Sequence, residues 1–131
     1  MTTDLTMLVW CVLLTLVSPY VYVTGLLIRP NGLAWGLGNR DQPLTGEAVW
    51  ALRARRAHAN LVENLVPFAA LVLVAHATGR SNGATALGAE LFFWARLLYL
   101  PAYILGLAPW RTLIFAVATL GEFLILLQLL H

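Results

Sequence analysis

The chain has 131 residues, of which 60% are hydrophobic and only 11% are charged. An average soluble domain has roughly 45–50% apolar and about 25% charged residues. This composition excludes a typical soluble globular protein and, more firmly, a disordered chain. The formal net charge of +2 is too small to indicate nucleic-acid binding. Most of the chain is therefore expected to face lipid or other protein chains.

The first apolar segment is predicted to be a helix at about residues 5–29. It contains no charged residue between Leu5 and Ile28, and it is long enough to span a bilayer. A signal peptide is rejected because the apolar run is too long and is preceded by Asp4 rather than by basic residues. Pro19 is expected to kink this helix.

A polar stretch joins the first segment to the second. It begins with Arg29-Pro30-Asn31-Gly32, which is typical of a helix end, and is predicted to form a loop as far as Pro43. Thr45 is expected to cap the next helix. Three further helices are predicted, at about residues 46–78, 85–107 and 110–130. The short connections predict a single all-α domain over residues 1–131, an integral membrane four-helix up-down bundle.

All eight basic residues are arginine, and they are unevenly divided between the two ends of the predicted bundle. The end with the polar loop carries Arg29, Arg40, Arg53, Arg55, Arg56 and Arg111. The opposite end has only Arg80, and Arg96 lies within the third predicted helix. Because cytoplasmic loops of membrane proteins are rich in arginine and lysine, the polar loop is predicted to be cytoplasmic and both termini outside.

The second predicted helix carries a polar stripe within a stretch that a membrane would cover. Arg56, Asn60 and Glu63 fall at i, i+4 and i+7, which at about 100° per residue places them on one face. Pro67 removes the hydrogen bond to the carbonyl of Glu63. In a membrane, the freed carbonyl requires another partner or a wet cavity.

The third predicted helix carries a second stripe. Arg96, Tyr99 and Tyr103 fall at i, i+3 and i+7, again on one face. Arg111 and Thr112 follow in the turn to the fourth helix. The two helices thus offer polar faces that are able to meet inside the bundle.

Two interpretations of these stripes are open. In the first, charges pair one to one between helices and fix the bundle, which we favour for Arg53 and Arg55. In the second, which we favour for the stripes as a whole, surplus arginine binds an anionic ligand or anionic lipid head groups. Intramembrane charge points to a functional site by default. No metal site is predicted, and the single Cys11 lies in an apolar run where nothing would stabilise a thiolate.

The motifs resemble a known family. The second helix contains Arg56-Ala57-His58-Ala59-Asn60-Leu61-Val62-Glu63 and then Pro67-Phe68, and the third contains Arg96-x-x-Tyr99-x-x-x-Tyr103. With Arg111 and the four-helix length, they resemble the MAPEG family, the membrane-associated proteins in eicosanoid and glutathione metabolism. Gly38-Asn39-Arg40-Asp41 resembles the loop of its bacterial branch. The resemblance implies a homotrimer in the bacterial inner membrane, with sites at subunit interfaces that open toward the cytoplasm.

The resemblance also implies glutathione as the cofactor. The positions that bind it correspond here to Arg29, Arg56, Asn60, Glu63, Arg96 and Thr112. The residue matching Glu63 meets the amino group of glutathione, and the residue matching Arg111 lies near its thiol. We therefore predict Arg111 as the catalytic residue that stabilises the thiolate, assisted by Tyr99 or Tyr103.

The predicted function is that of a glutathione-dependent membrane transferase, with hydroperoxide reduction as a second activity, acting on lipophilic electrophiles. The predicted partners are other copies of the chain, membrane lipids and the lipophilic substrate. The alternative is a non-catalytic lipid-binding or scaffold protein of the same fold. Ala59 and Phe115 favour that alternative, because some glutathione-binding members carry a basic residue and a tyrosine there. A transporter is disfavoured, since the sequence shows no inverted repeat.

Overall fold

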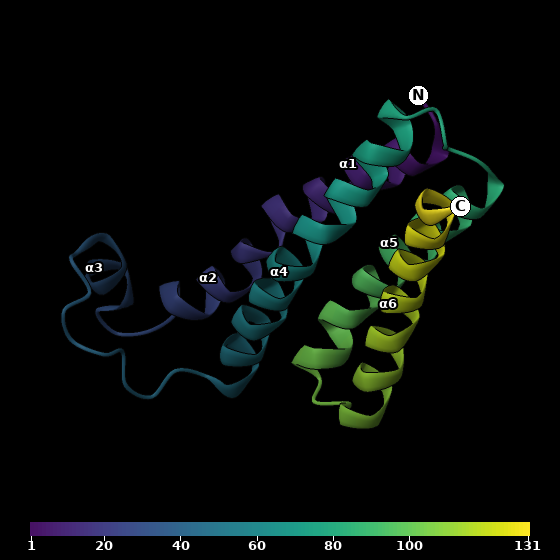
Figure 1. The fold of residues 1–131 in the computed structure, drawn as a ribbon. Coiled ribbons are helices and arrows are strands. Elements are labelled where there is room, and N and C mark those ends of the chain that lie inside the picture. Colours follow the sequence, from purple (N-terminus) through teal and green to yellow (C-terminus); the bar gives the residue numbers. More distant parts are fainter.

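A computed structural model describes residues 1–131, and it is all-helical (Figure 1). The helices are α1 (Thr3–Val17), α2 (Pro19–Leu27), α3 (Gly32–Leu37), α4 (Val49–Ala77), α5 (Gly83–Ile104) and α6 (Ala108–Leu130). The segments long and apolar enough to cross a membrane are Thr3–Leu27, Val49–Ala77 and Ala108–Leu130. The chain is thus a membrane helical bundle with three such segments. Helix α5, which carries Glu90 and Arg96, is not among them.

The first predicted helix is interrupted where proline was expected to distort it. α1 ends at Val17 and α2 begins at Pro19, because the proline nitrogen has no hydrogen to donate to the preceding turn. Ser18, at the break, is 1% exposed. Its hydroxyl donates to the carbonyl of Thr15 at 3.3 Å and lies 2.7 Å from Nδ1 of His58. The break is therefore tied to α4.

The structure corrects the predicted connection between the first two segments. Part of the predicted loop is the short helix α3, which follows Asn31 in a left-handed conformation with φ of 58°. α4 begins at Val49 instead of residue 46, and Thr45 does not cap it, since the N-cap residue is Ala48 without a side-chain hydrogen bond. The carbonyl of Thr45 instead accepts from the Arg29 guanidinium.

The last two helices also differ from the prediction: α6 begins at Ala108 instead of residue 110 and ends at Leu130 as predicted, and α5 differs at both ends. α5 begins at Gly83 because Asn82 forms a capping box with Thr85. It ends at Ile104, before Gly106 adopts a left-handed conformation with φ of 74°. Glycine adopts that conformation without steric cost, which allows the sharp turn into α6.

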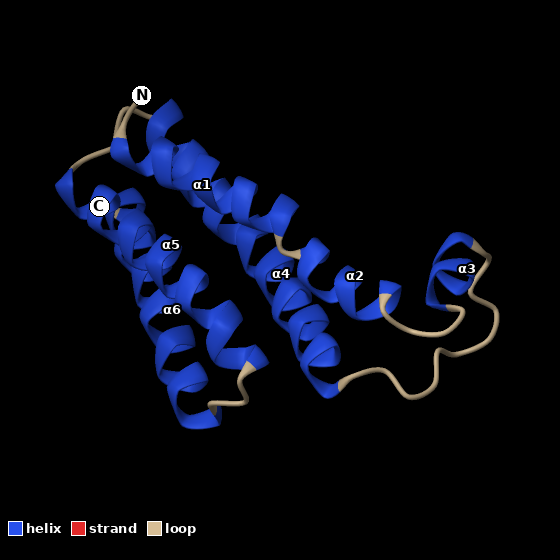
Figure 2. Cartoon of the chain, turned by 180° about the vertical axis from the view of Figure 1, so that it is seen from behind, coloured by secondary structure: helices blue, strands red, loops and turns tan.

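Both termini lie at the same end of the bundle, beside the turn between α4 and α5 (Figure 1). There, Thr85 donates to the buried carboxylate of Asp4 at 3.0 Å, and Arg80 donates to the carbonyl of Leu129 at 2.5 Å. The start of α4, the turn between α5 and α6, and the segment with α2 and α3 lie toward the opposite end (Figure 2). Arginine-rich segments are thus gathered at one end of the molecule.

The core holds α1, α4, α5 and α6 together, and α5 packs most extensively on α6. The rings of Phe68 and Phe92 stack with centroids 3.9 Å apart between α4 and α5. Gly88 and Gly121 lie where α5 crosses α6: a Cβ on Gly88 would come within 2.5 Å of the carbonyl oxygen of Gly121. Small residues of this kind let membrane helices approach closely.

The substitution Gly88→Ala is expected to lower the free energy of unfolding by about 1–3 kcal/mol, the usual cost of overpacking a tight contact. Gly83→Ala is the matched control, since a Cβ there meets nothing within 4 Å. Thermal unfolding in detergent compares the two. Equal unfolding midpoints for both variants would contradict the close α5–α6 contact.

Candidate functional site

The centre of the candidate site is the Arg96 side chain, which is 2% exposed and projects from α5. Its Nη1 donates to Oδ1 of Asn60 on α4 at 2.7 Å. The guanidinium carbon lies 5.1 Å from the ring centroid of Phe92, 5.5 Å from that of Tyr99 and 5.1 Å from that of Phe115. Its Nε and Nη2 are buried and have no hydrogen-bond partner. A buried cation with free N–H groups is suited to an anion.

A second arginine lies at the end of the same aromatic cluster. The guanidinium carbon of Arg111, in the first turn of α6, lies 4.5 Å from the ring centroid of Tyr103. The Tyr103 ring meets Tyr99 edge to face at 5.6 Å, and Tyr99 lies 6.5 Å from Phe115. Continuous aromatic contacts therefore join Arg96 to Arg111. Two lining residues were not among the predicted site residues: Phe92, one turn before Arg96, and Phe115, one turn after Arg111, which the sequence analysis named only as a departure from the family pattern.

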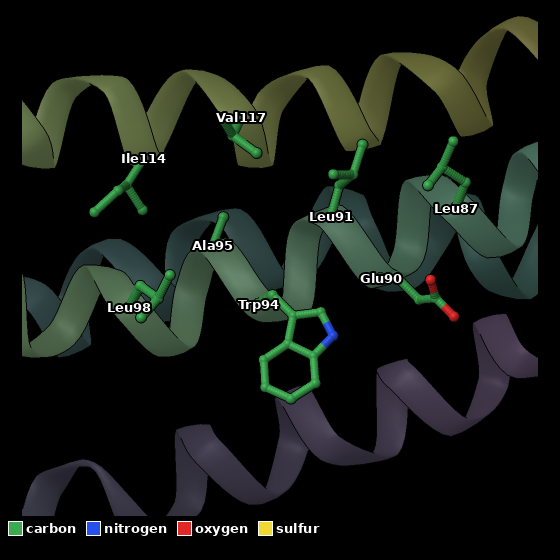
Figure 3. A pocket seen from close by; sticks show the side chains of 8 residues that line it. All are labelled: Leu87, Glu90, Leu91, Trp94, Ala95, Leu98, Ile114 and Val117. Carbon is green, nitrogen blue, oxygen red and sulfur yellow. The ribbon is translucent and has the colours of Figure 1, made fainter.

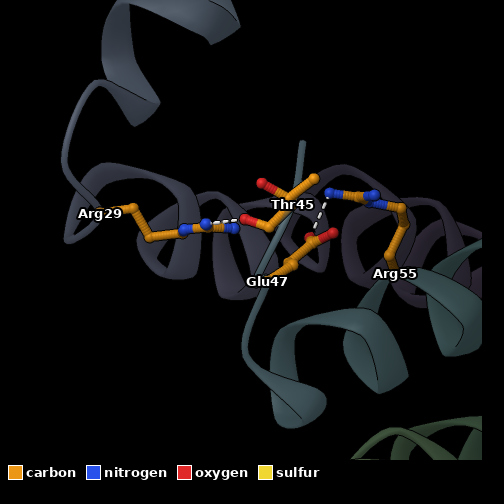
Figure 4. Close-up of polar contacts among 4 residues, drawn as sticks. All are labelled: Arg29, Thr45, Glu47 and Arg55. Atoms are coloured by element: carbon orange, nitrogen blue, oxygen red, sulfur yellow. Dashed lines mark hydrogen bonds and ion pairs between the residues drawn. The ribbon is translucent and has the colours of Figure 1, made fainter. Parts of the chain in front are cut away.

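Not every predicted site residue joins this cluster. Arg56 and Glu63 lie on α4 on either side of Asn60, are exposed, and make no side-chain hydrogen bond or ion pair within the chain. Thr112 is exposed, and its hydroxyl donates to the carbonyl of Ala108 at 3.2 Å. The Arg29 guanidinium donates to the carbonyl of Thr45 (Figure 4). A single chain thus assembles Asn60, Arg96, Tyr99, Tyr103 and Arg111, but not Arg29, Arg56, Glu63 or Thr112.

Two other arginines at this end have partners in the chain. Arg55 forms an ion pair with Glu47, whose side chain is 6% exposed (Figure 4). Nη1 of Arg53 donates to the carbonyl of Ile104 at 3.4 Å. These contacts agree with the structural role that we favoured for both residues. The surplus of cations is therefore carried by the arginines of the two stripes and by Arg111.

An apolar groove of about 280 Å³ runs along α5 and α6 beside the cluster (Figure 3). Its lining residues are Leu87, Glu90, Leu91, Trp94, Ala95, Leu98, Ile114 and Val117. Ala95 directly precedes Arg96, and Ile114 directly precedes Phe115, so the groove and the cluster share the same stretch of both helices. Carbon surface of this kind favours an acyl chain or another lipophilic group.

The all-helical fold, the membrane-competent segments and the buried arginine define an integral membrane protein of the helical-bundle class. The sequence model of the MAPEG family matches residues 7–131, and the chain belongs to this family. Membership supports a membrane function in glutathione or eicosanoid metabolism in general. No curated protein and no solved structure matches the chain.

Proposed function

We propose that the chain is a glutathione-dependent membrane transferase that conjugates glutathione to lipophilic electrophiles. The observation that carries this proposal is the buried Arg96, which donates to Asn60 through Nη1 but forms no ion pair and leaves Nε and Nη2 without a hydrogen-bond partner. Glutathione is a net anion with two carboxylates and one ammonium group. Surplus arginine together with the unpaired carboxylate of Glu63 matches that distribution of charge.

We further propose that the site is completed between subunits of a homotrimer. Arg56 and Glu63 lack partners in a single chain and are exposed on a membrane-competent helix, where an unpaired charge costs about 2.5–3.5 kcal/mol. A neighbouring subunit and the ligand would remove that cost. Arg29 follows α2 and donates to the Thr45 carbonyl rather than joining the cluster of its own chain, so its proposed contribution is across a subunit boundary.

The chemistry proposed for the site is activation of the thiol. A free thiol with a pKa of about 8.5 is mostly protonated at pH 7. Lowering that pKa by about two requires about 2.7 kcal/mol of preferential thiolate stabilisation, which the Arg111 guanidinium, with Tyr99 or Tyr103, would supply in a partly dry site. The thiol proton leaves to water, and the thiolate sulfur forms a bond to the electrophilic carbon as the leaving group departs. The same thiolate would reduce a hydroperoxide by attacking its terminal oxygen. The O–O bond breaks, the alkoxide takes a proton from water and leaves as the alcohol, and the sulfur becomes a sulfenic acid, which a second glutathione converts to the disulfide with loss of water.

The proposed orientation in the membrane rests on the uneven division of arginine between the two ends of the bundle. We propose four membrane-spanning helices, including α5, in a bacterial inner membrane with both termini outside. The loop between α2 and α4 then faces the cytoplasm, as does the start of α6 with Arg111. The apolar groove beside the cluster would admit the substrate from the lipid phase.

The second candidate function is lipid binding without chemistry. It is favoured by the groove itself and by Phe115, which lines the cluster with a ring that has no hydroxyl to offer a ligand. A protein of this kind would hold an acyl chain in the groove and would bind glutathione weakly or not at all.

Glu63→Gln separates the two functions. If Glu63 meets the ammonium group of glutathione, the variant is expected to bind glutathione about 10- to 30-fold more weakly, the scale of one lost charge-assisted hydrogen bond. The matched measurement uses a glutathione analogue without the amino group, which wild type and variant should bind equally. A Glu63→Gln protein that binds glutathione as tightly as wild type contradicts the proposed role, and wild type without glutathione binding favours the lipid-binding function.

A further inference from the structure

A polar cavity of about 360 Å³ lies between α2, α3 and α4, outside the candidate glutathione site. Its lining residues are Tyr22, Val23, Leu26, Trp35, Arg40 and Arg55. The two arginines come from distant parts of the sequence, and no acidic residue lines the cavity. The transferase proposed above has no use for this cavity.

Contacts within the polar segment hold Arg40 at the cavity. Nε1 of Trp35 donates to the carbonyl of Gln42 at 2.7 Å, which fastens α3 to the following chain. Arg40 has a positive φ of 58°, a conformation that few residues other than glycine adopt. Its guanidinium returns to the carbonyl of Gly36 through Nε at 3.3 Å and Nη2 at 3.0 Å, and it lies 5.4 Å from the Trp35 ring centroid.

Arg55 reaches the cavity from α4. Its guanidinium carbon lies 5.5 Å from the ring centroid of Tyr22, and Nη2 bonds to Glu47. The remaining nitrogens of Arg55, and Nη1 of Arg40, make no hydrogen bond within the chain. Two guanidinium groups, each packed on an aromatic ring, thus keep N–H groups free. Such groups recognise phosphate oxygens well.

The cavity lies where the protein would leave the membrane. The membrane-competent segments Thr3–Leu27 and Val49–Ala77 end and begin beside it. The intervening chain exposes large apolar side chains, with Ile28 75%, Leu33 56% and Leu37 81% exposed. Exposed apolar side chains in the same segment as arginine, at the end of a membrane-competent helix, are typical of contact with the head-group region.

From this arrangement we infer that the cavity binds the phosphate of an anionic phospholipid head group, with Arg40 as the unpaired cation and Arg55, whose charge is already balanced by Glu47, as a further N–H donor. The acyl chains of that lipid lie against Leu33 and Leu37. A lipid is favoured over a free anion because Arg40 and the exposed apolar side chains belong to one short segment that joins two membrane-competent segments. The site holds α3 on the membrane and is independent of glutathione.

Arg40→Gln tests this inference, with Arg80→Gln as the control that removes the same charge from the opposite end of the bundle. Native mass spectrometry of purified protein measures the binding of phosphatidylglycerol and of phosphatidylcholine with the same acyl chains. Wild type and Arg80→Gln are expected to bind phosphatidylglycerol at least about fivefold more tightly than phosphatidylcholine, the contribution of roughly one arginine near a charged surface. Arg40→Gln is expected to lose that preference, and Arg40→Lys to restore part of it.

Three results would overturn the inference. If the wild-type protein does not prefer phosphatidylglycerol, the cavity does not select an anionic lipid. If Arg40→Gln and Arg80→Gln lose the preference for phosphatidylglycerol equally, the preference depends on the net charge of the protein and not on a site at Arg40. Displacement of phosphatidylglycerol by millimolar inorganic phosphate would identify a soluble anion as the occupant. Repeating the measurement with glutathione present distinguishes the lipid site from the glutathione site, since glutathione is expected to leave phosphatidylglycerol binding unchanged.

Discussion

Arg111→Ala is expected to return the pKa of bound glutathione toward the value of about 8.5 for a free thiol, and to lower turnover at neutral pH about 100-fold, as the loss of one preorganised charge-stabilising group does. The reason is the position of Arg111 at the edge of the aromatic cluster. Its guanidinium lies 4.5 Å from the Tyr103 ring centroid and has no ion-pair partner in the chain. Its charge therefore remains available to a thiolate.

The loss of activity in Arg111→Ala is expected to be large at neutral pH and to become smaller as the pH rises. In wild type the thiolate is present at neutral pH, so the rate changes little as the pH rises. In Arg111→Ala the thiol is protonated at neutral pH, and the rate is expected to rise toward wild type above pH about 8.5 as the thiolate forms unaided. Arg111→Lys, which keeps the charge, should retain part of the activity. An unchanged thiol pKa in Arg111→Ala would show that the role of Arg111 is wrong.

Arg96→Met is expected to weaken glutathione binding at least about 30-fold, the lower range for loss of a buried charged partner, while leaving the unfolding midpoint unchanged or higher. In the unliganded chain the buried guanidinium makes one hydrogen bond, to Asn60, and leaves two nitrogens without a partner. Burial of an incompletely paired charge costs stability, and removing the guanidinium relieves that cost, which offsets the loss of its single hydrogen bond to Asn60.

Opposite effects on binding and stability distinguish a ligand-binding Arg96 from a structural one. If Arg96 serves only to join α4 to α5 through Asn60, its replacement lowers the unfolding midpoint. Leu97→Met, on the same helix, provides the control and should change neither quantity. If Arg96→Met binds glutathione with normal affinity, Arg96 does not take part in glutathione binding.

Periodicity in the sequence accounts for the part of the cluster that lies on regular helix. The spacing of Arg96, Tyr99 and Tyr103 predicted one face of α5, and Tyr99 does contact Tyr103. The family membership that the motifs suggested is confirmed over residues 7–131. Pro19 marked the break between α1 and α2 correctly, because a proline acts on its own backbone whatever the tertiary structure.

What the sequence could not supply depends on contacts between distant segments. Gly32 and Gly36 within the segment, and Gly38 directly after it, made a loop the natural prediction, although Gly32–Leu37 forms α3. The ion pair of Arg55 with Glu47 removes one arginine from the surplus, and the loop geometry that permits it has no local signature. Arg29 was grouped with the site by resemblance, yet its guanidinium is held by the Thr45 carbonyl.

Equilibrium binding of reduced glutathione to the detergent-purified protein, read with the ultraviolet absorbance of the thiolate near neutral pH, tests the proposed function most directly. Saturable binding accompanied by a thiolate signal is the expected result, because Arg111 lies next to Tyr103 with its charge unpaired. Binding without a thiolate signal would contradict the catalytic role of Arg111. Absence of binding at millimolar glutathione would contradict the transferase itself and leave the lipid-binding function.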